Sequence, residues 1–379
     1  MERYLQWAVD NQKLTPGAAD LIRKFLTDRI IDRGVSNATA ANRAKYLGLF
    51  LQVLPKPVQE CSTDDVRGTL AAMRSRYKPN TFGQMLYTST TFLEWLKIPA
   101  IDIPVLKKIK APPADRTTKT AAEMLSEEDV QRLIKATRNS RDRALVTVMY
   151  ESGCRPIEMV RLSWDEVKFD EWGAVINTAE KTGTPRYIRL IMSSPALAAW
   201  KADYPGQISK GARVFVKHRG NPPRPITTTT IRRLLEKLVR QAGLKKRMYP
   251  YLVRHSRVTH MMEQQIPESV IKLQHWGSLR TDMLATYAHV SNSHVDQVLL
   301  ERAGVSEKKK RRDSLLKPVQ CPQCQTINLP GAEFCGRCGL SFSEEGIAAV
   351  NVVRNLMSNP DDLIAYAEYR KRQKEKISQ

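Results

Sequence analysis

The amino-acid sequence predicts a mainly α-helical fold with a small antiparallel β-sheet and a separate cysteine-rich module. Apolar residues recur at helical spacing through residues 1–100 and again through the second half of the chain. Two short runs rich in β-branched and aromatic residues, 175–177 and 187–190, flank a Lys-Thr-Gly turn. Four of the six cysteines form two CxxC pairs near the C-terminus. We therefore expect helical domains, one hairpin and a small metal-binding module.

Residues 1–100 are expected to form an all-helical domain. Pro16 stands near the start of one amphipathic stretch, and a second apolar stripe stops before Pro55. Ser62 and the acidic residues after it are a typical cap for the next helix. Residues 101–122 combine prolines with a run of lysines, so we expect a linker there.

A second domain is expected over residues 123–304. Ser126, followed by acidic residues, predicts a helix start, and the apolar stretch that ends at Tyr150 predicts a buried helix. Further helices are expected after the hairpin region, one after Ser194 and one from Thr227 to Ala242. The remaining chain is divided into a basic linker at 305–318, the cysteine module at 319–343 and a helical tail at 344–379.

Composition narrows the class of partner. The chain has 379 residues, a formal net charge of +22 and a pI near 9.8, with lysine and arginine in every segment. This charge favours nucleic acid, because each neutralised phosphate releases counterions, although ribosome-associated proteins and binders of anionic membranes are also basic. No apolar run approaches the roughly 18 residues that span a bilayer, and a signal-peptide core is absent. Paired cysteines indicate a metal site in a reducing compartment, so we expect a cytoplasmic protein without a membrane partner.

Four residues in the second half of the chain have contexts that suit phosphodiester chemistry. They are Arg155 in Gly-Cys-Arg-Pro-Ile-Glu, Lys181 in Glu-Lys-Thr-Gly, Arg254 in Tyr-Leu-Val-Arg-His and Tyr287 in Thr-Tyr-Ala-His-Val. Two guanidinium groups, one ammonium and one phenol can hold and cut a DNA backbone without a metal ion. Singly, each has a structural alternative: an ion-paired or surface arginine, a solubilising hairpin lysine, a packed tyrosine.

The order and contexts of these four residues resemble the tyrosine recombinases, or phage-type integrases, most closely their archaeal branch. The resemblance extends over about residues 123–300 in its motifs, and over residues 1–100 only in character. It implies a DNA breaking-rejoining fold, preceded by a helical core-binding domain that clamps duplex DNA. It also implies a site-specific recombinase that works through a 3′-phosphotyrosyl intermediate, without a catalytic cofactor, and assembles as a homotetramer on paired sites.

The resemblance gives each of the four residues a role. Arg155 and Arg254 would bind the non-bridging phosphate oxygens, because a planar guanidinium donates two hydrogen bonds and stays charged. Lys181 would protonate the leaving 5′-oxygen from a hairpin tip, and Tyr287 would be the nucleophile. Glu158, three residues after Arg155, shares its helical face and can hold the guanidinium.

Two positions depart from the family pattern. Tyr251 stands where the family usually has His or Lys, three residues before Arg254; a hydrogen-bonding role survives there, whereas a simple imidazole base does not. His255 could partly substitute for that base, but we favour a structural role for it. In Leu-Gln-His-Trp-Gly, Trp276 takes the position of the family's His or Trp donor, with His275 as the alternative. A core tryptophan is the competing interpretation.

The cysteine module has the spacing of a structural zinc site. Two CxxC knuckles separated by ten residues supply four thiolates, which suits tetrahedral zinc in a zinc ribbon, and a redox-active CxxC is the weaker alternative. A closed four-thiolate site contributes to folding rather than to catalysis. The expected ligands are Cys321, Cys324, Cys335 and Cys338.

Three other functions were weighed against recombination. A type IB-like topoisomerase shares the chemistry and would only remove supercoils. A catalytically silent, zinc-containing DNA-binding regulator would bind DNA and never cut it, and the Tyr251 departure is its one support. A metal-dependent nuclease or transposase is less favoured, because no acidic constellation for two metal ions is apparent in the sequence.

Overall fold

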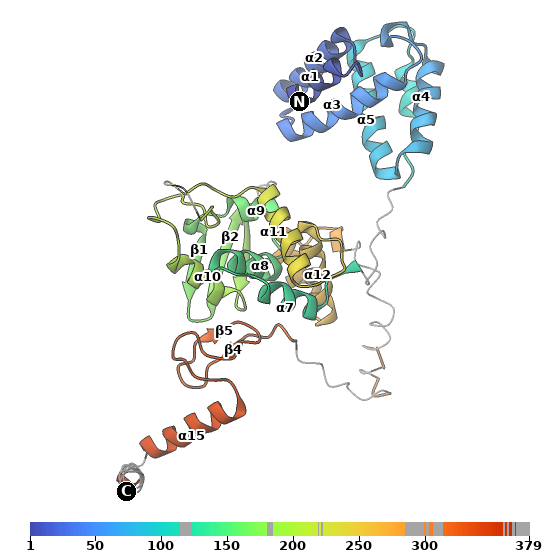
Figure 1. The fold of residues 1–379 in the computed structure, drawn as a ribbon. Helices are drawn as coiled ribbons and strands as arrows, with labels where there is room; N and C mark the ends of the chain where they lie inside the picture. Colours follow the sequence, from blue (N-terminus) through green and yellow to red (C-terminus); the bar gives the residue numbers. More distant parts are fainter. Residues whose placement is uncertain are drawn as a thin grey trace. The chain divides into compact units, whose positions relative to one another are not determined.

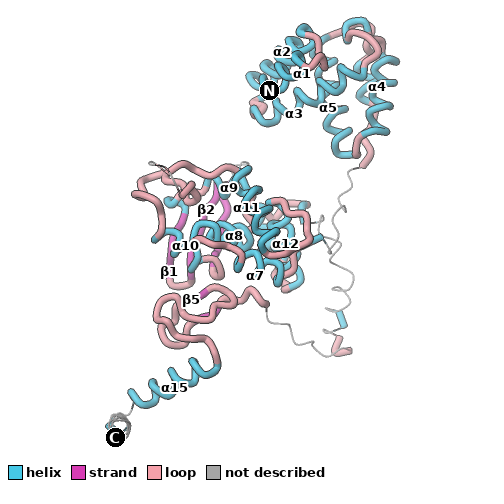
Figure 2. Tube along the Cα trace, viewed as in Figure 1, coloured by secondary structure: helices cyan, strands magenta, loops and turns pink. Residues whose placement is uncertain are grey.

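The computed structural model describes residues 1–113, 123–179, 185–218, 220, 223–284, 299–300, 303–305, 314–358, 361, 364–365 and 368 (Figure 1). The chain divides into two compact units, Met1–Thr118 and Lys119–Gln379. Helices dominate both, and the strands are few and short (Figure 2). The predicted fold class, mainly α with a small antiparallel sheet, is confirmed. None of the helices in the described part of the chain is long and apolar enough to cross a membrane.

Residues 1–113 of the first unit form helices joined by turns, and no strand lies in this described range. Their starts are fixed by local side-chain caps: Thr15 accepts a hydrogen bond from the backbone of Ala18, and Ser62 forms a capping box with Asp65. In chain order the helices are α1 (Glu2–Asp10), α2 (Pro16–Arg33), α3 (Asn37–Val53), η1 (Val58–Glu60), α4 (Thr63–Arg76), α5 (Pro79–Leu96) and α6 (Ile103–Lys107).

Two apolar clusters hold this unit together. One joins α1, α2, α3 and α5, and in it Phe25 and Phe92 meet edge to face with ring centroids 5.3 Å apart. The other joins α3, α4, α5 and α6. Ile101 and Leu106 are buried in the second cluster, so the start of the expected linker packs against the helices before it.

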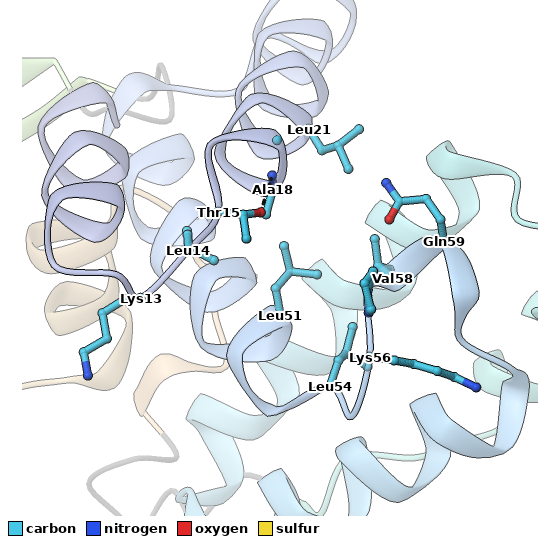
Figure 3. A pocket seen from close by; sticks show the side chains of 12 residues that line it. Lys13, Leu14, Thr15, Ala18, Leu21, Leu51, Leu54, Lys56, Val58 and Gln59 are labelled. Carbon is cyan, nitrogen blue, oxygen red and sulfur yellow. Dashed lines mark hydrogen bonds between the residues drawn. The ribbon is translucent and has the colours of Figure 1, made fainter.

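A cavity of about 340 Å³ opens between α2, α3 and η1 of this unit (Figure 3). Leu21, Leu51 and Leu54 line it, whereas the amines of Lys13 and Lys56 point away from it. Its lining contains none of the residues expected to carry chemistry, so we assign no reaction to it.

The second unit surrounds one central helix. Helix α8 is buried from Ala144 to Ser152 and contacts α7, α9, α10, α12 and β3 (Figure 1). The helices are α7 (Glu127–Lys135), α8 (Ser140–Ser152), α9 (Pro156–Arg161), η3 (Trp164–Glu166), α10 (Ser194–Ala202), α11 (Thr228–Gln241), α12 (Pro250–Glu263), α13 (Glu268–Trp276) and α15 (Glu344–Ser358). Ser126 caps α7, as expected from the sequence, and Thr227, where a helix was expected to begin, caps α11.

The sheet has three strands in the order β1 (Val167–Asp170), β2 (Gly173–Ala179) and β3 (Pro185–Leu190), all antiparallel. The predicted hairpin corresponds to β2 and β3, and Ile176 pairs with Ile188. The first strand was not predicted: its sequence, Val-Lys-Phe-Asp, is only four residues long, and three of the four residues are exposed. The buried face of the sheet packs toward α8 and α10.

The cysteine module also belongs to the second unit. It contains a two-stranded sheet, β4 (Val319–Gln320) and β5 (Ile327–Asn328). The chain just before it is anchored, since the carboxylate of Glu127 accepts hydrogen bonds from Ser314 Oγ and the Leu315 amide at 2.8 and 2.9 Å. Leu316 is buried in the large core cluster. The end of the expected basic linker is therefore docked on α7.

Candidate active site

A tight turn between α8 and α9 presents Arg155. Helix α8 ends at Ser152, Gly153 takes a left-handed conformation with φ of 57°, and Pro156 starts α9. The Arg155 amide donates to Glu158 Oε2 at 2.6 Å, and its Nη1 donates to Glu158 Oε1 at 2.9 Å. One carboxylate thus fixes both the backbone and the guanidinium of Arg155, whose side chain stays 29% exposed. The Arg155–Glu158 pairing expected from the sequence is present.

Arg254 extends from α12 into the interior and is only 4% exposed. Its Nη1 donates to the carbonyl oxygen of Gly153 at 2.5 Å, and its Nη2 donates to that of His275 at 2.6 Å. Burial, followed by the positive charges of Arg155 and Arg186, lowers the pKa of Arg254 to about 10. The guanidinium therefore remains charged at neutral pH in a site where positive charges repel one another.

Arg186 is a site residue that the sequence analysis missed. It lies on β3 with a side chain that is 0% exposed, and its Nη2 donates to Glu158 Oε2 at 2.5 Å. Its Nη1 donates to the carbonyl oxygens of His275 and Gln274 at 2.9 and 3.1 Å. Strand alternation could have found it, because Arg186 shares the inward face with Ile188 and Leu190.

His275 is completely buried at the last turn of α13. Its Nδ1 lies 3.2 Å from the carbonyl oxygen of Ile271, and within the described residues its Nε2 has no hydrogen-bond partner. The ring covers Gly153, because a Cβ added there would lie 2.4 Å from Nε2. Burial, then the charges of Arg254, Arg257 and Arg186, keep the pKa of His275 well below its usual value, so the imidazole is neutral at pH 7.

Trp276 lies next to His275 but contacts different groups. It is 8% exposed and belongs to an apolar cluster with Val258, Met261 and Ile271. The Arg254 guanidinium lies over its ring, 5.3 Å from the centroid. Trp276 is thus buried among apolar side chains and stacks against the guanidinium of Arg254.

Two other predicted site residues, Tyr251 and His255, lie on α12 near Arg254. Tyr251 lies on α12, one turn before Arg254, and is 46% exposed. His255 is half-buried on the same helix. Lys181 and Tyr287 lie outside the described residues, Lys181 between β2 and β3 in the sequence and Tyr287 beyond α13.

The cluster as a whole suits a bound anion. Three arginines face one glutamate around a neutral histidine, which leaves an excess of two positive charges in a mostly buried site. The guanidinium groups of Arg155 and Arg254 offer planar sets of donors that match a phosphate, and Arg186 adds positive charge from within the protein. What the arrangement can do chemically is hold a phosphodiester and stabilise charge on its oxygens.

The four cysteines of the C-terminal module converge as metal ligands would. Their sulfur atoms all lie within 4.8 Å of one another, and none forms a disulfide. The Sγ atoms of Cys321 and Cys338, and those of Cys324 and Cys335, are 3.5 Å apart. Four thiolates at such separations fit a tetrahedral ion with metal–sulfur bonds of about 2.3 Å.

Comparison with protein families matches residues 123–294 to the phage integrase family. Tyrosine recombinase XerA of Pyrococcus furiosus is 30% identical over 192 residues, which cover 50% of this chain and 64% of that protein. Tyrosine recombinase XerD of Pseudomonas putida is 26% identical over 73% of this chain and 95% of that protein.

Solved structures with the same fold include DNA complexes. XerH recombinase bound to its difH substrate aligns with a TM-score of 0.55 and 14% identity, over 81% of this chain and 94% of that one. A lambda integrase tetramer bound to a Holliday junction aligns with a TM-score of 0.53 and 14% identity, over 69% of this chain and 78% of that one. At such identities the likeness establishes the fold.

Proposed function

We propose that this chain, whose residues 123–294 match the phage integrase family, is a tyrosine recombinase of that family that cuts and rejoins double-stranded DNA at specific sites. The single observation that carries the proposal is the mostly buried arginine cluster, in which Arg155 and Arg186 bind the Glu158 carboxylate and Arg254 shares the His275 carbonyl oxygen with Arg186. Its excess positive charge matches a DNA phosphate. All three arginines lie within residues 123–294, the part of the chain that matches the phage integrase family.

The proposed reaction uses a phenol as nucleophile. The Tyr287 phenol gives its proton to a base or to water as its oxygen attacks phosphorus; a 3′-phosphotyrosyl bond forms, and the bond to the 5′-oxygen breaks. Arg155 and Arg254 bind the non-bridging oxygens, whose negative charge grows in the transition state. Lys181 gives its proton to the departing 5′-oxygen. Religation reverses these steps. The phosphotyrosyl bond conserves the energy of the DNA phosphodiester bond, so no nucleotide cofactor is consumed.

His275 is the better candidate for the additional donor to the phosphate. Its Nε2 is buried beside Arg254 and lacks a partner within the described residues, whereas Trp276 packs into an apolar cluster. The approach of an anion would raise the pKa of His275, because opposite charge favours the protonated ring. We propose that His275 donates from Nε2 to a phosphate oxygen. Tyr251, exposed on α12, is proposed to make only a peripheral hydrogen bond.

The cysteine module is proposed to hold one structural zinc ion. Cys321, Cys324, Cys335 and Cys338 would bind it, and four thiolates leave no open position for a reacting group. The ion would add folding free energy to a segment too small for its own apolar core. We assign it no step in DNA cleavage.

Assembly and location follow from the same family membership. We propose that the first unit and the catalytic unit together clamp duplex DNA, and that four copies assemble on paired sites. The lambda integrase tetramer shares this fold, which supports the arrangement. Since the substrate is DNA, we propose a cytoplasmic location.

A nicked suicide substrate tests the proposal. Binding sites are first selected from a pool of DNA that flanks the coding region, and each is then nicked close to the cleavage position so that religation fails. The full-length protein is expected to become covalently attached to the 3′-phosphate side. Tyr287→Phe is expected to bind the same DNA and to form no adduct.

The same substrates separate the rival functions. Specific binding without any adduct by the unmodified chain would support a silent regulator and contradict the proposal. An adduct accompanied by relaxation of supercoiled plasmids, without exchange between paired sites, would support a topoisomerase. Exchange of strands between two sites supports recombination.

A further inference from the structure

Arg186 hydrogen-bonds two segments of the anion site, Glu158 on α9 and the last turn of α13. We propose that Arg186 is a positioning residue that sets the distance between the phosphate-binding Arg155 and the C-terminal end of α13. The inference rests on the proposed function for its catalytic consequence. Arg186 itself is enclosed by protein, so it does not bind the DNA.

Each end of the Arg186 guanidinium contacts a different segment. On one side, its Nη2 donates to Glu158 Oε2, the same oxygen that accepts from the Arg155 amide. On the other side, its Nη1 donates to the carbonyl oxygens of Gln274 and His275. Arg186 therefore links the α8–α9 turn to the last turn of α13.

The carbonyl oxygen of His275 is the shared point of the network. It accepts from Arg186 at 2.9 Å and from Arg254 at 2.6 Å, so both of its lone pairs are used. It also lies at a helix C-terminus, where free carbonyls and the helix dipole favour positive charge. Any displacement of Arg186 would therefore disturb Arg155 through Glu158, and Arg254 through this carbonyl.

Stability alone does not explain a buried arginine at position 186, whereas a link between α9 and the end of α13 does. A buried ion pair adds little stability compared with well-packed apolar side chains, because both charges lose their hydration. What the planar guanidinium offers is geometry, since its donors diverge at fixed angles and reach two acceptor groups at once. A lysine at position 186 would keep the charge and lose this fixed geometry.

Helix α13 also leads along the chain toward the proposed nucleophile. It ends at Trp276, eleven residues before Tyr287. Fixing the end of α13 relative to Arg155 thus fixes the start of the segment that carries the phenol relative to the phosphate site. A misplacement of about 1 Å at such a site lowers rates by roughly 100-fold.

Substitution of Arg186 tests the proposal against a matched control on the same strand. The variants are Arg186→Met, Arg186→Lys and Arg189→Met; Arg189 is partly exposed and pairs with Asp170 at the surface. Arg186→Met leaves the buried Glu158 without this ion-pair partner. Arg186→Lys keeps an ion pair with Glu158, so it is the variant to measure if Arg186→Met does not fold. All are made in the full-length chain.

Two measurements are made on each variant. Single-turnover adduct formation on the nicked substrate is expected to fall roughly 100-fold in Arg186→Met and at least tenfold in Arg186→Lys. Their DNA affinity should stay within about threefold, because Arg186 does not reach the surface. Amide hydrogen exchange without DNA is expected to rise both in residues 153–162 and in residues 271–277, and Arg189→Met should change neither segment.

The outcomes separate this inference from the proposed function. Adduct formation at the unmodified rate in both Arg186 variants would overturn the positioning role. So would increased exchange in only one of the two segments, because the link would then be absent. Failure of the unmodified chain to form any adduct would count against the proposed function, and the exchange measurement would still decide whether Arg186 couples the two segments.

Discussion

Replacing Gly153 by alanine tests the packing of the anion site through a single methyl group. Gly153 has φ of 57°, and an added Cβ would lie 2.4 Å from His275 Nε2 and 2.7 Å from its Cδ2. The left-handed conformation alone costs an alanine roughly 1–2 kcal/mol. Displacing a fully buried ring adds about 1–3 kcal/mol. The free energy of unfolding of the second unit is therefore expected to fall by roughly 2–5 kcal/mol.

Gly34 is the matched control for this substitution. It caps α2 with φ of 61° and ψ of 28°, close to the 57° and 24° of Gly153, but nothing lies within 4 Å of its added Cβ. Gly34→Ala should therefore lose only the conformational part, roughly 1–2 kcal/mol, from the transition of the first unit. Chemical denaturation monitored separately for each unit measures both values. Equal losses in the two variants would refute the packing of His275 on Gly153.

Three further predictions concern charge and metal. The pKa of His275 is held well below 6.5, so below pH 6.5 the unfolded chain binds a proton that the folded chain excludes. The free energy of unfolding should therefore fall by up to about 1.4 kcal/mol per pH unit below 6.5. Denaturation at pH 7.5 and 5.5 should show this loss to be smaller in His275→Asn, and equal losses would contradict it. Phosphate at constant ionic strength should stabilise the DNA-free protein by about 1.4 kcal/mol at tenfold its dissociation constant, and thermal unfolding should show the gain reduced in Arg155→Met. Metal analysis should find one zinc ion per unmodified chain and none in Cys335→Ser. In that variant the backbone amide hydrogens of residues 319–343 should exchange faster, and an unchanged exchange rate would exclude a structural metal.

Local sequence rules predicted much of the fold. Ser62 and Ser126 cap their helices as expected, because a cap depends only on residues within one turn. The β2–β3 pairing was also predicted from local sequence, because the two strands are neighbours in the chain and flank a short turn. Strand β1 was missed because Val-Lys-Phe-Asp, although it alternates apolar and polar residues, is only four residues long, and its place in the sheet is set by pairing with β2.

The candidate site was predicted only in part, because it depends on contacts between distant segments. The Arg155–Glu158 pair follows from helical spacing, and Arg254 was identified by its motif. Arg186 was not, since its partners lie 28 and 89 residues away and no local pattern relates them. The choice between His275 and Trp276 was likewise open, because adjacent helical residues face different neighbours and only the packing of α12 and α13 distinguishes them.

The site of covalent attachment tests the central claim most directly. The protein–DNA adduct formed on a nicked substrate is digested with protease and nuclease, and the linked peptide is sequenced by mass spectrometry. A 3′-phosphonucleotide attached to the oxygen of Tyr287 is the predicted result. Attachment to another residue, or a peptide without any nucleotide, would contradict a reaction in which this tyrosine opens the DNA strand.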